Sequence, residues 1–132
     1  METMTKNMRE HAKEVANVAW QQLVATTRPE VICSWGVENL AYTIFGMEKQ
    51  NPALTFKVNG LLFKGRIFIV LDEGADYYQI YGMKDGMITS ISSDVCFDEM
   101  GEIIDSFVER GSFTQEEYSK RISEEIRKSL FA

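Results

Sequence analysis

The chain has 132 residues, of which 45% are hydrophobic and 26% are charged, and this composition is typical of a folded globular protein and excludes a disordered one. The length suffices for one domain and is too short for two ordinary ones, so we expect residues 1–132 to form a single domain. The net charge of −6 makes a nucleic-acid backbone an unfavourable main partner, because phosphate binding requires a basic surface.

Nothing in the sequence has the pattern of a secretory signal or a membrane span. The first residues lead directly into a polar helical pattern, and the longest apolar run, residues 67–71, has five residues, whereas a membrane span requires about 20. Cys33 and Cys96 stand far apart in the chain, which favours reduced, buried thiols over a disulfide. We therefore expect a soluble cytoplasmic protein without a membrane partner.

Helical spacing dominates the N-terminal third. Apolar residues recur three and four positions apart and predict a helix from about Asn7 to about Thr26. A second apolar stripe predicts a shorter helical segment within residues 29–46, which Gly36 divides and Gly46 ends. The residues of this second stripe are Val37, Leu40, Ala41, Ile44 and Phe45. The two segments together predict an N-terminal helical hairpin.

From Leu54 onward apolar and polar residues alternate, which indicates strands. The patterns at residues 54–58, 61–71, 77–81 and 87–91 predict an antiparallel meander of about four strands. Asn59-Gly60 and Asp85-Gly86 are the residue pairs that two-residue hairpin turns prefer. In the second strand Gly65 is a candidate bulge, and apolar residues on both faces near Val70 indicate that both faces are covered there.

Two helices are predicted at the C-terminal end. An apolar stripe predicts the first of them over residues 97–110, and a capping box of Thr114 and Glu117 begins the second. Strands flanked by segregated helices define the α+β class. The last helix has a narrow apolar stripe, which indicates an interface with another protein or with a second copy of the chain. The candidate interface residues are Tyr118, Ile122, Ile126, Leu130 and Phe131.

The sequence lacks the patterns that hold metals, phosphates or activated nucleophiles. It has one histidine, no C-x-x-C pair, no glycine-rich phosphate loop and no G-x-S-x-G. His11 and Cys33 would form a base and nucleophile only if the fold brought them together. Four acidic residues of the helix at 97–110 share one face by spacing, and we expect this face to be solvated. They are Asp98, Glu102, Asp105 and Glu109. We expect no cofactor, no metal and no catalytic residue.

The best candidate for a ligand or partner surface combines tyrosines with cations from a neighbouring strand. It consists of Lys64, Arg66, Tyr77, Tyr78 and Tyr81. Aromatic rings beside cations can receive a planar ligand. Because side chains alternate along a strand, Tyr77 and Tyr81 should share one face and Tyr78 should lie on the other. Ordinary cross-strand packing explains the same residues, so both interpretations stay open.

Three stretches of the chain resemble small uncharacterised bacterial domains found in mobile-element cargo. They are Val-Asn-Gly-Leu-Leu-Phe at residues 58–63, Asp-Tyr-Tyr-Gln-Ile-Tyr at residues 76–81 and Gly-Glu-Ile-Ile-Asp at residues 101–105. These positions belong to hairpins and packing faces. The resemblance implies a small bacterial domain of unassigned activity, and it assigns a catalytic role to no residue.

Three functions are compatible with these features. The first is a non-enzymatic protein-interaction or adaptor module that uses the C-terminal helices, and the narrow stripe of the last helix favours it. The second is a small-ligand-binding domain or weak enzyme with a pocket between the tyrosine-rich strand and the helices. The third is an accessory protein of a mobile element that handles nucleic acid through Lys57, Lys64 and Arg66.

Overall fold

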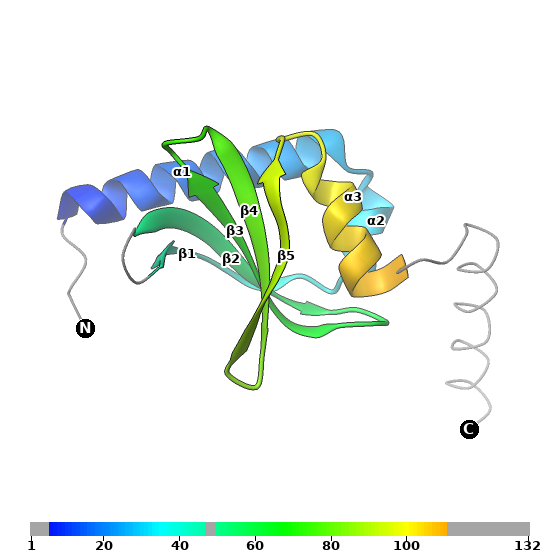
Figure 1. The fold of residues 1–132 in the computed structure, drawn as a ribbon. Helices are drawn as coiled ribbons and strands as arrows, with labels where there is room; N and C mark the ends of the chain where they lie inside the picture. Colours follow the sequence, from blue (N-terminus) through cyan, green and yellow to red (C-terminus); the bar gives the residue numbers. More distant parts are fainter. Residues whose placement is uncertain (1–5, 47–49, 111–132) are drawn as a thin grey trace, which may run out of the picture.

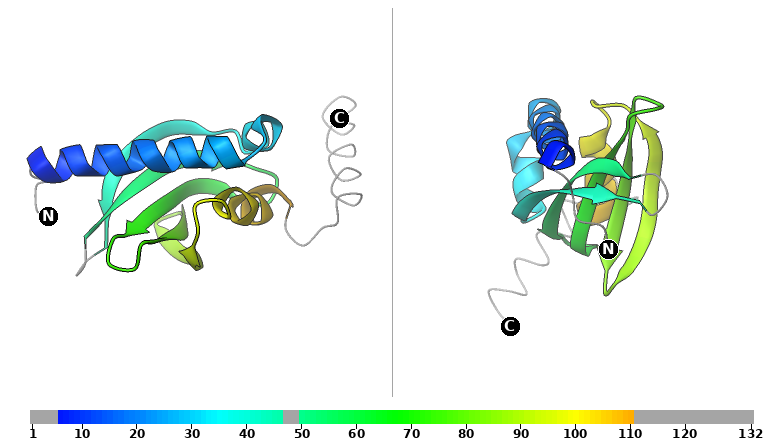
Figure 2. Two further views of the ribbon diagram at one scale, coloured as in Figure 1. Left: turned by 90° about the horizontal axis from the view of Figure 1, so that it is seen from above. Right: turned by 90° about the vertical axis from the view of Figure 1, so that its left-hand side faces the viewer.

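The computed structural model describes residues 6–46 and 50–110, and these form two layers (Figures 1 and 2). One layer is a five-stranded antiparallel sheet. The other consists of the helices α1, α2 and α3, which lie on one face of that sheet. The predicted α+β class is therefore confirmed, with five strands in place of the four that the alternation suggested.

The long helix α1 (Lys6–Thr26) agrees with its prediction. It lies against β1 and β2 (Figure 2) and turns one apolar stripe to the sheet, while its charged residues are exposed. The buried residues of the stripe are Ala12, Val15, Ala16, Ala19 and Leu23. Alanine at three of these positions lets the helix approach the sheet closely. The Trp20 ring meets Phe56 of β2 edge-on, with 6.1 Å between the ring centroids.

The predicted second helix is wrong beyond Ser34. Helix α2 spans only Pro29–Ser34, and Gly36 ends it with a left-handed φ of 61° while its N–H donates to the Cys33 carbonyl. The next residues form the strand β1 (Glu38–Phe45), which pairs antiparallel with β2. Its second half, Tyr-Thr-Ile-Phe, consists of aromatic and β-branched residues that fit a pleated surface. The N-terminal part is thus a long helix, a short helix and an edge strand.

The remaining strands are β2 (Asn51–Asn59), β3 (Lys64–Asp72), β4 (Tyr77–Lys84) and β5 (Met87–Val95). The sheet order β1-β2-β3-β4-β5 confirms the meander. Asp85 and Gly86 have φ values of 53° and 77°, as expected for the predicted tight turn. The register from β2 to β4 has no shift, so Gly65 is not a bulge. A Cβ at Gly65 would lie 2.4 Å from the Met83 carbonyl oxygen, which explains the glycine.

The Asn59-Gly60 turn prediction is also wrong, because residues 60–63 form a longer loop that binds the C-terminal turn. This turn, η1 (Ser106–Arg110), is π-helical. The Leu62 and Phe63 amides both donate to the Val108 carbonyl, at 2.9 and 3.2 Å. The Gly60 backbone lies so close to Val108 that an added Cβ would be 2.3 Å from Val108 Cγ1. Gly60 is therefore needed for close packing and not for a left-handed turn.

The acidic face of the third helix is only partly solvated, which corrects the prediction. Helix α3 (Met100–Asp105) gives way to the π-helical turn η1, so the face calculated from α-helical spacing does not continue to Glu109. Asp105 and Glu109 are 8% and 5% exposed. The buried Trp35 indole donates from Nε1 to Asp105 Oδ1 at 3.0 Å, and the Leu61 amide donates to Glu109 Oε2 at 2.6 Å. Asp105 thus ties α3 to the residue that follows α2, and Glu109 ties η1 to the loop between β2 and β3.

The hydrophobic core lies between the helices and the sheet and includes Trp35, Phe56, Ile69 and Ile104. None of the helices within residues 6–46 and 50–110 is long and apolar enough to cross a membrane. The predicted last helix and its interface residues lie outside the described residues. The interface at Tyr118, Ile122, Ile126, Leu130 and Phe131 therefore stays a prediction.

Candidate functional site

The outer face of the sheet, which we define as the face opposite α1, α2 and α3, carries charged and aromatic side chains in neighbouring rows. The strand register gives the residues of each row from β1 to β5. The first row is Glu38, Lys57, Arg66, Met83 and Ile88. The second row is Ala41, Thr55, Phe68, Tyr81 and Ser90. Cations of β2 and β3 thus lie one row away from aromatic rings of β3 and β4.

Three aromatic rings of the outer face pack on one another. Phe45 lies at 5.3 Å from Phe68 and stacks on Tyr81 at 4.5 Å, measured between ring centroids. Phe45 belongs to an edge strand, so this contact requires the strongly curved sheet that Figure 2 shows. Ala53 and Val70 lie in the row between these rings and are fully buried. The prediction that both faces are covered near Val70 is confirmed.

Arg66 has a defined structural role on this face. Its Nε donates to Thr55 Oγ1 at 3.1 Å, and its Nη2 donates to the Asn39 carbonyl at 3.0 Å. Asn39 has a φ of 54° and lies where the register between β1 and β2 shifts. Arg66 therefore ties the irregular part of the edge strand β1 to β3, and its position is fixed.

Only part of the tyrosine and cation group lies on one face of the sheet, as the alternation predicts. Tyr81 shares the outer face with Lys64 and Arg66, and its hydroxyl donates to Gln79 Oε1 at 2.8 Å. Tyr77 lies on the same face at the far end of β4, opposite Asp72. Tyr78 points to the helices, as the alternation predicts, and its hydroxyl donates to Gln22 Oε1 at 2.7 Å. Burial raises the pKa of the Tyr78 phenol, and the negative charge of Asp76 adds to the effect.

A pocket of about 170 Å³ opens between α1 and the edge strand β1. Its walls are mostly apolar, with a cation and an amide from α1 at the rim. The lining residues are Lys13, Ala16, Asn17, Trp20, Leu40, Ala41, Tyr42 and Leu54. Lys13, Asn17 and Trp20 recur at helical spacing and so share one side of α1. None of Tyr77, Tyr78 and Tyr81 lines this pocket, so it is not the pocket predicted beside the tyrosine-rich strand, which stays a prediction.

The α1–β1 pocket could not be predicted while residues 29–46 were interpreted as helical, because the pocket exists only if β1 is a strand beside α1. The four consecutive strand-favouring residues Tyr42–Phe45 are the local signal that could have revealed it. The strand assignment alone would still leave the pairing of β1 with α1 undetermined. Its location is a product of the tertiary structure.

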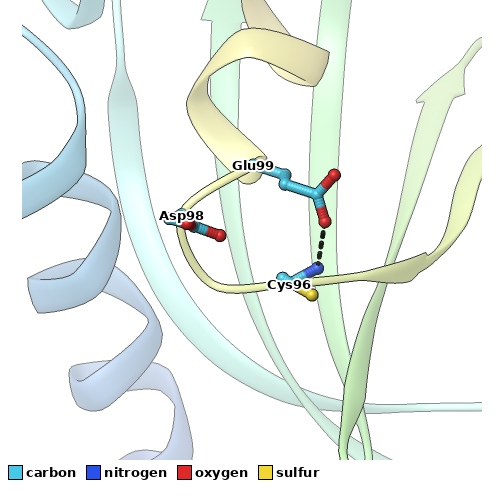
Figure 3. A group of neighbouring side chains, drawn as sticks. All are labelled: Cys96, Asp98 and Glu99. Atoms are coloured by element: carbon cyan, nitrogen blue, oxygen red, sulfur yellow. Dashed lines mark hydrogen bonds between the residues drawn. The ribbon is translucent and has the colours of Figure 1, made fainter.

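The loop between β5 and α3 brings together Cys96, Asp98 and Glu99, whose potential ligand atoms lie within 4.8 Å of one another (Figure 3). The Cys96 amide donates to Glu99 Oε1 at 2.9 Å, and the Glu99 amide donates to the Cys96 carbonyl at 3.0 Å. These bonds lower the pKa of the Glu99 carboxyl. Hydrogen bonding to Glu99, followed by burial and nearby negative charge, raises the pKa of the Cys96 thiol and so disfavours the reactive thiolate. The hydrogen bonds between Cys96 and Glu99 close the turn that leads into α3.

The two thiols depart from their prediction, and the histidine binds a carboxylate. Cys33 and Cys96 are exposed, so the prediction of buried thiols is wrong; one lies on a short helix and the other in a loop, where the core does not reach. His11 Nε2 lies 2.9 Å from Glu73 Oε2 in the turn between β3 and β4. His11 also precedes the end of α1 by 15 residues, or about 22 Å of helix. The structure therefore does not pair His11 with Cys33.

No family model matches the chain, and neither do curated proteins or solved structures. The geometry of the chain itself is therefore the basis for a functional proposal.

Proposed function

We propose that the chain is a non-enzymatic protein-interaction module and that its partner places one large apolar side chain in the α1–β1 pocket. The volume of about 170 Å³ is close to the roughly 150 Å³ of an apolar cavity that accommodates benzene. It is smaller than the roughly 300–1,000 Å³ of ordinary small-molecule sites. One leucine, phenylalanine or tryptophan side chain fits these dimensions.

The walls of the pocket have the chemistry of an interface centre. Trp20 and Tyr42 are half-buried aromatic residues on opposite sides of it, and Leu40 remains 49% exposed at its edge. Interface hot spots are typically aromatic pockets that exclude water once a partner side chain fills them. An apolar anchor would cover Leu40 and complete the burial of both rings.

The surroundings of the pocket indicate an extended, acidic partner segment. The Lys13 ammonium at the rim has no ion-pair partner within residues 6–46 and 50–110, and an acidic residue next to the anchor would pair with it. Among the residues that the structure describes, the neighbouring strand β1 has a paired strand on one side only. Its regular part, Ala41–Phe45, offers backbone donors and acceptors on the other side, where an extended segment can add to a sheet.

A non-enzymatic role is consistent with how the potentially reactive groups are used. His11 binds Glu73 in an exposed pair, and Glu99 caps the turn before α3. Asp105 and Glu109 hold Trp35 and the loop at residues 60–63 in place. Each of these groups serves the fold.

The test is selection of random peptides displayed on phage against the immobilised full-length chain. We expect enriched peptides to share an apolar anchor next to an acidic residue. Binding of a synthetic consensus peptide should fall at least about tenfold in Leu40→Glu, because a charge would enter the apolar pocket. Lys13→Glu should weaken peptides with acidic flanks and spare peptides with neutral ones.

Val18→Glu is the matched control. Val18 is 43% exposed and belongs to α1, and it does not line the pocket. All three variants should keep the melting temperature of the native chain, since the altered side chains are on the surface. Failure to enrich any peptide, or peptides that bind native protein and Leu40→Glu equally well, would rule the proposal out.

A further inference from the structure

A second hollow, of about 360 Å³, lies between the α2–β1 connection and the ends of β2 and β3. It is more polar than the α1–β1 pocket and borders the first residue of β1, whereas that pocket borders Leu40, Ala41 and Tyr42 farther along the strand. The lining residues are Gly36, Glu38, Lys57, Val58, Asn59, Lys64 and Gly65. We infer that this hollow is an anion site that binds the phosphate group of a small phosphorylated molecule. The inference does not depend on the peptide site proposed above.

The arrangement of cations around the hollow is costly for the fold. Lys57 of β2 lies directly opposite Arg66 of β3, and Lys64 is two residues from Arg66 on the same face. Like charges directly opposite each other destabilise a sheet. The chain nevertheless gathers these three cations although its net charge is −6. A bound anion would offset the repulsion between the cations, and this relief would favour its binding.

The two lysines are available to a ligand. Within the described residues neither the Lys57 nor the Lys64 ammonium lies within ion-pair distance of a carboxylate. Lys57 is flanked by Glu38 on β1 and Arg66 on β3, and both lysine side chains are exposed. They come from adjacent antiparallel strands and border one hollow. Two lysines that are unpaired within the described residues and line one hollow are suited to binding an oxyanion.

Arg66 and Asn59 provide further positive charge and a neutral hydrogen-bond donor for a bound anion. Arg66 does not itself line the hollow, but its guanidinium is held by Thr55 and by the Asn39 carbonyl, and it adds a positive charge directly across from Lys57, which does line it. Asn59 lines the hollow opposite Lys64 and contributes a neutral side-chain amide donor. Phosphate accepts several hydrogen bonds at once, and a combination of charged and neutral donors matches it.

Glu38 and the dimensions of the hollow favour a small ligand over a polymer. The Glu38 carboxylate borders the hollow and repels an anion that extends toward β1. A volume of about 360 Å³ lies within the range of small-molecule sites. A nucleic acid would instead require a continuous basic track, and the net charge of −6 opposes it.

The test is a titration of the full-length chain with inorganic phosphate at constant ionic strength, followed by amide chemical shifts. We expect saturable shifts centred on Gly36, Lys57, Asn59 and Lys64. Lys57→Gln and Lys64→Gln should each weaken phosphate binding at least about tenfold, the loss typical of one charge-assisted contact. Lys84→Gln removes an exposed lysine at the end of β4 that does not line the hollow, and it should leave binding unchanged.

Melting temperatures distinguish a variant that has lost the anion site from a variant that no longer folds. Without phosphate, Lys57→Gln and Lys64→Gln should melt at or above the temperature of the native chain, and phosphate should raise the melting temperature of the native chain only. The inference is overturned if phosphate produces no saturable shift, or if Lys84→Gln weakens binding as much as Lys57→Gln. It is equally overturned if a short single-stranded oligonucleotide binds this surface while phosphate does not.

Discussion

The hydrogen bond between Trp35 and Asp105 should be a major determinant of stability. Trp35 is fully buried, Asp105 is 8% exposed, and the indole Nε1 donates to Asp105 Oδ1 at 3.0 Å. In Asp105→Ala the indole N–H would stay buried without its acceptor. Such an unsatisfied group costs about 1–3 kcal/mol, which is a large part of the roughly 5–15 kcal/mol by which a domain is stable.

Two further variants provide losses of stability with which the loss in Asp105→Ala can be compared. Asp105→Asn keeps a carbonyl oxygen for the indole but removes the charge, so it should cost less than Asp105→Ala. Glu102→Ala removes an exposed carboxylate from the same helix, and it should change stability by no more than about 0.5 kcal/mol. The loss of stability should therefore be smallest for Glu102→Ala, larger for Asp105→Asn and largest for Asp105→Ala.

The assay is urea denaturation followed by far-ultraviolet circular dichroism. Asp105 makes interactions besides the one with Trp35, so a double-mutant cycle with Trp35→Phe is needed to isolate the pair. The coupling between the two substitutions should be about 1 kcal/mol or more. If Asp105→Ala costs no more than Glu102→Ala, or if the coupling is close to zero, the hydrogen bond between α3 and the end of α2 is not a major determinant of stability.

Four further substitutions test other parts of the structure. Thr27 Oγ1 is buried without a hydrogen-bond partner within residues 6–46 and 50–110. Thr27→Val should therefore raise the free energy of unfolding by about 1 kcal/mol. A lower free energy of unfolding in urea denaturation would contradict this. Because the raised pKa of Tyr78 means that the folded state favours the neutral phenol, the native chain should lose stability as the pH rises above the ordinary value of 10.0. Tyr78→Phe should lose the hydrogen bond to Gln22 at every pH but show a weaker decline above pH 10.0 in parallel denaturation curves. Gly60→Ala should cost about 1–3 kcal/mol or more, and Val108→Ala should not restore it, because the added Cβ would still lie 2.4 Å from the carbonyl oxygen of residue 108.

Several elements could be predicted from the sequence because their signals are local. The apolar stripe of α1 recurs with the helical period, and the sides that it buries follow from that period. The alternation in β2 to β4 likewise predicts which residues face the helices, including the opposite directions of Tyr78 and Tyr81. The turn at Asp85 and Gly86 depends on the φ values of two adjacent residues. Each of these features needs only neighbours in the chain.

Other features were decided by partners far away in the sequence. The apolar residues from Val37 to Phe45 fit a helix or a strand, and pairing with β2 selects the strand. Gly60 follows an asparagine as in a tight turn, but the approach of Val108 makes the loop longer. The π-helical turn brings Glu109 inward, and a buried indole attracts Asp105.

The candidate sites belong to the second group. The α1–β1 pocket requires a helix and a strand from different predicted elements to lie side by side. The anion hollow requires the register that sets Lys57 opposite Arg66 and Lys64 opposite Asn59. Periodicity along the chain determines which side of an element is apolar, whereas register and packing between distant elements determine which side chains meet. For this reason the sequence by itself determined the α+β class and the buried side of α1, and only the tertiary structure decided which side chains line the proposed sites.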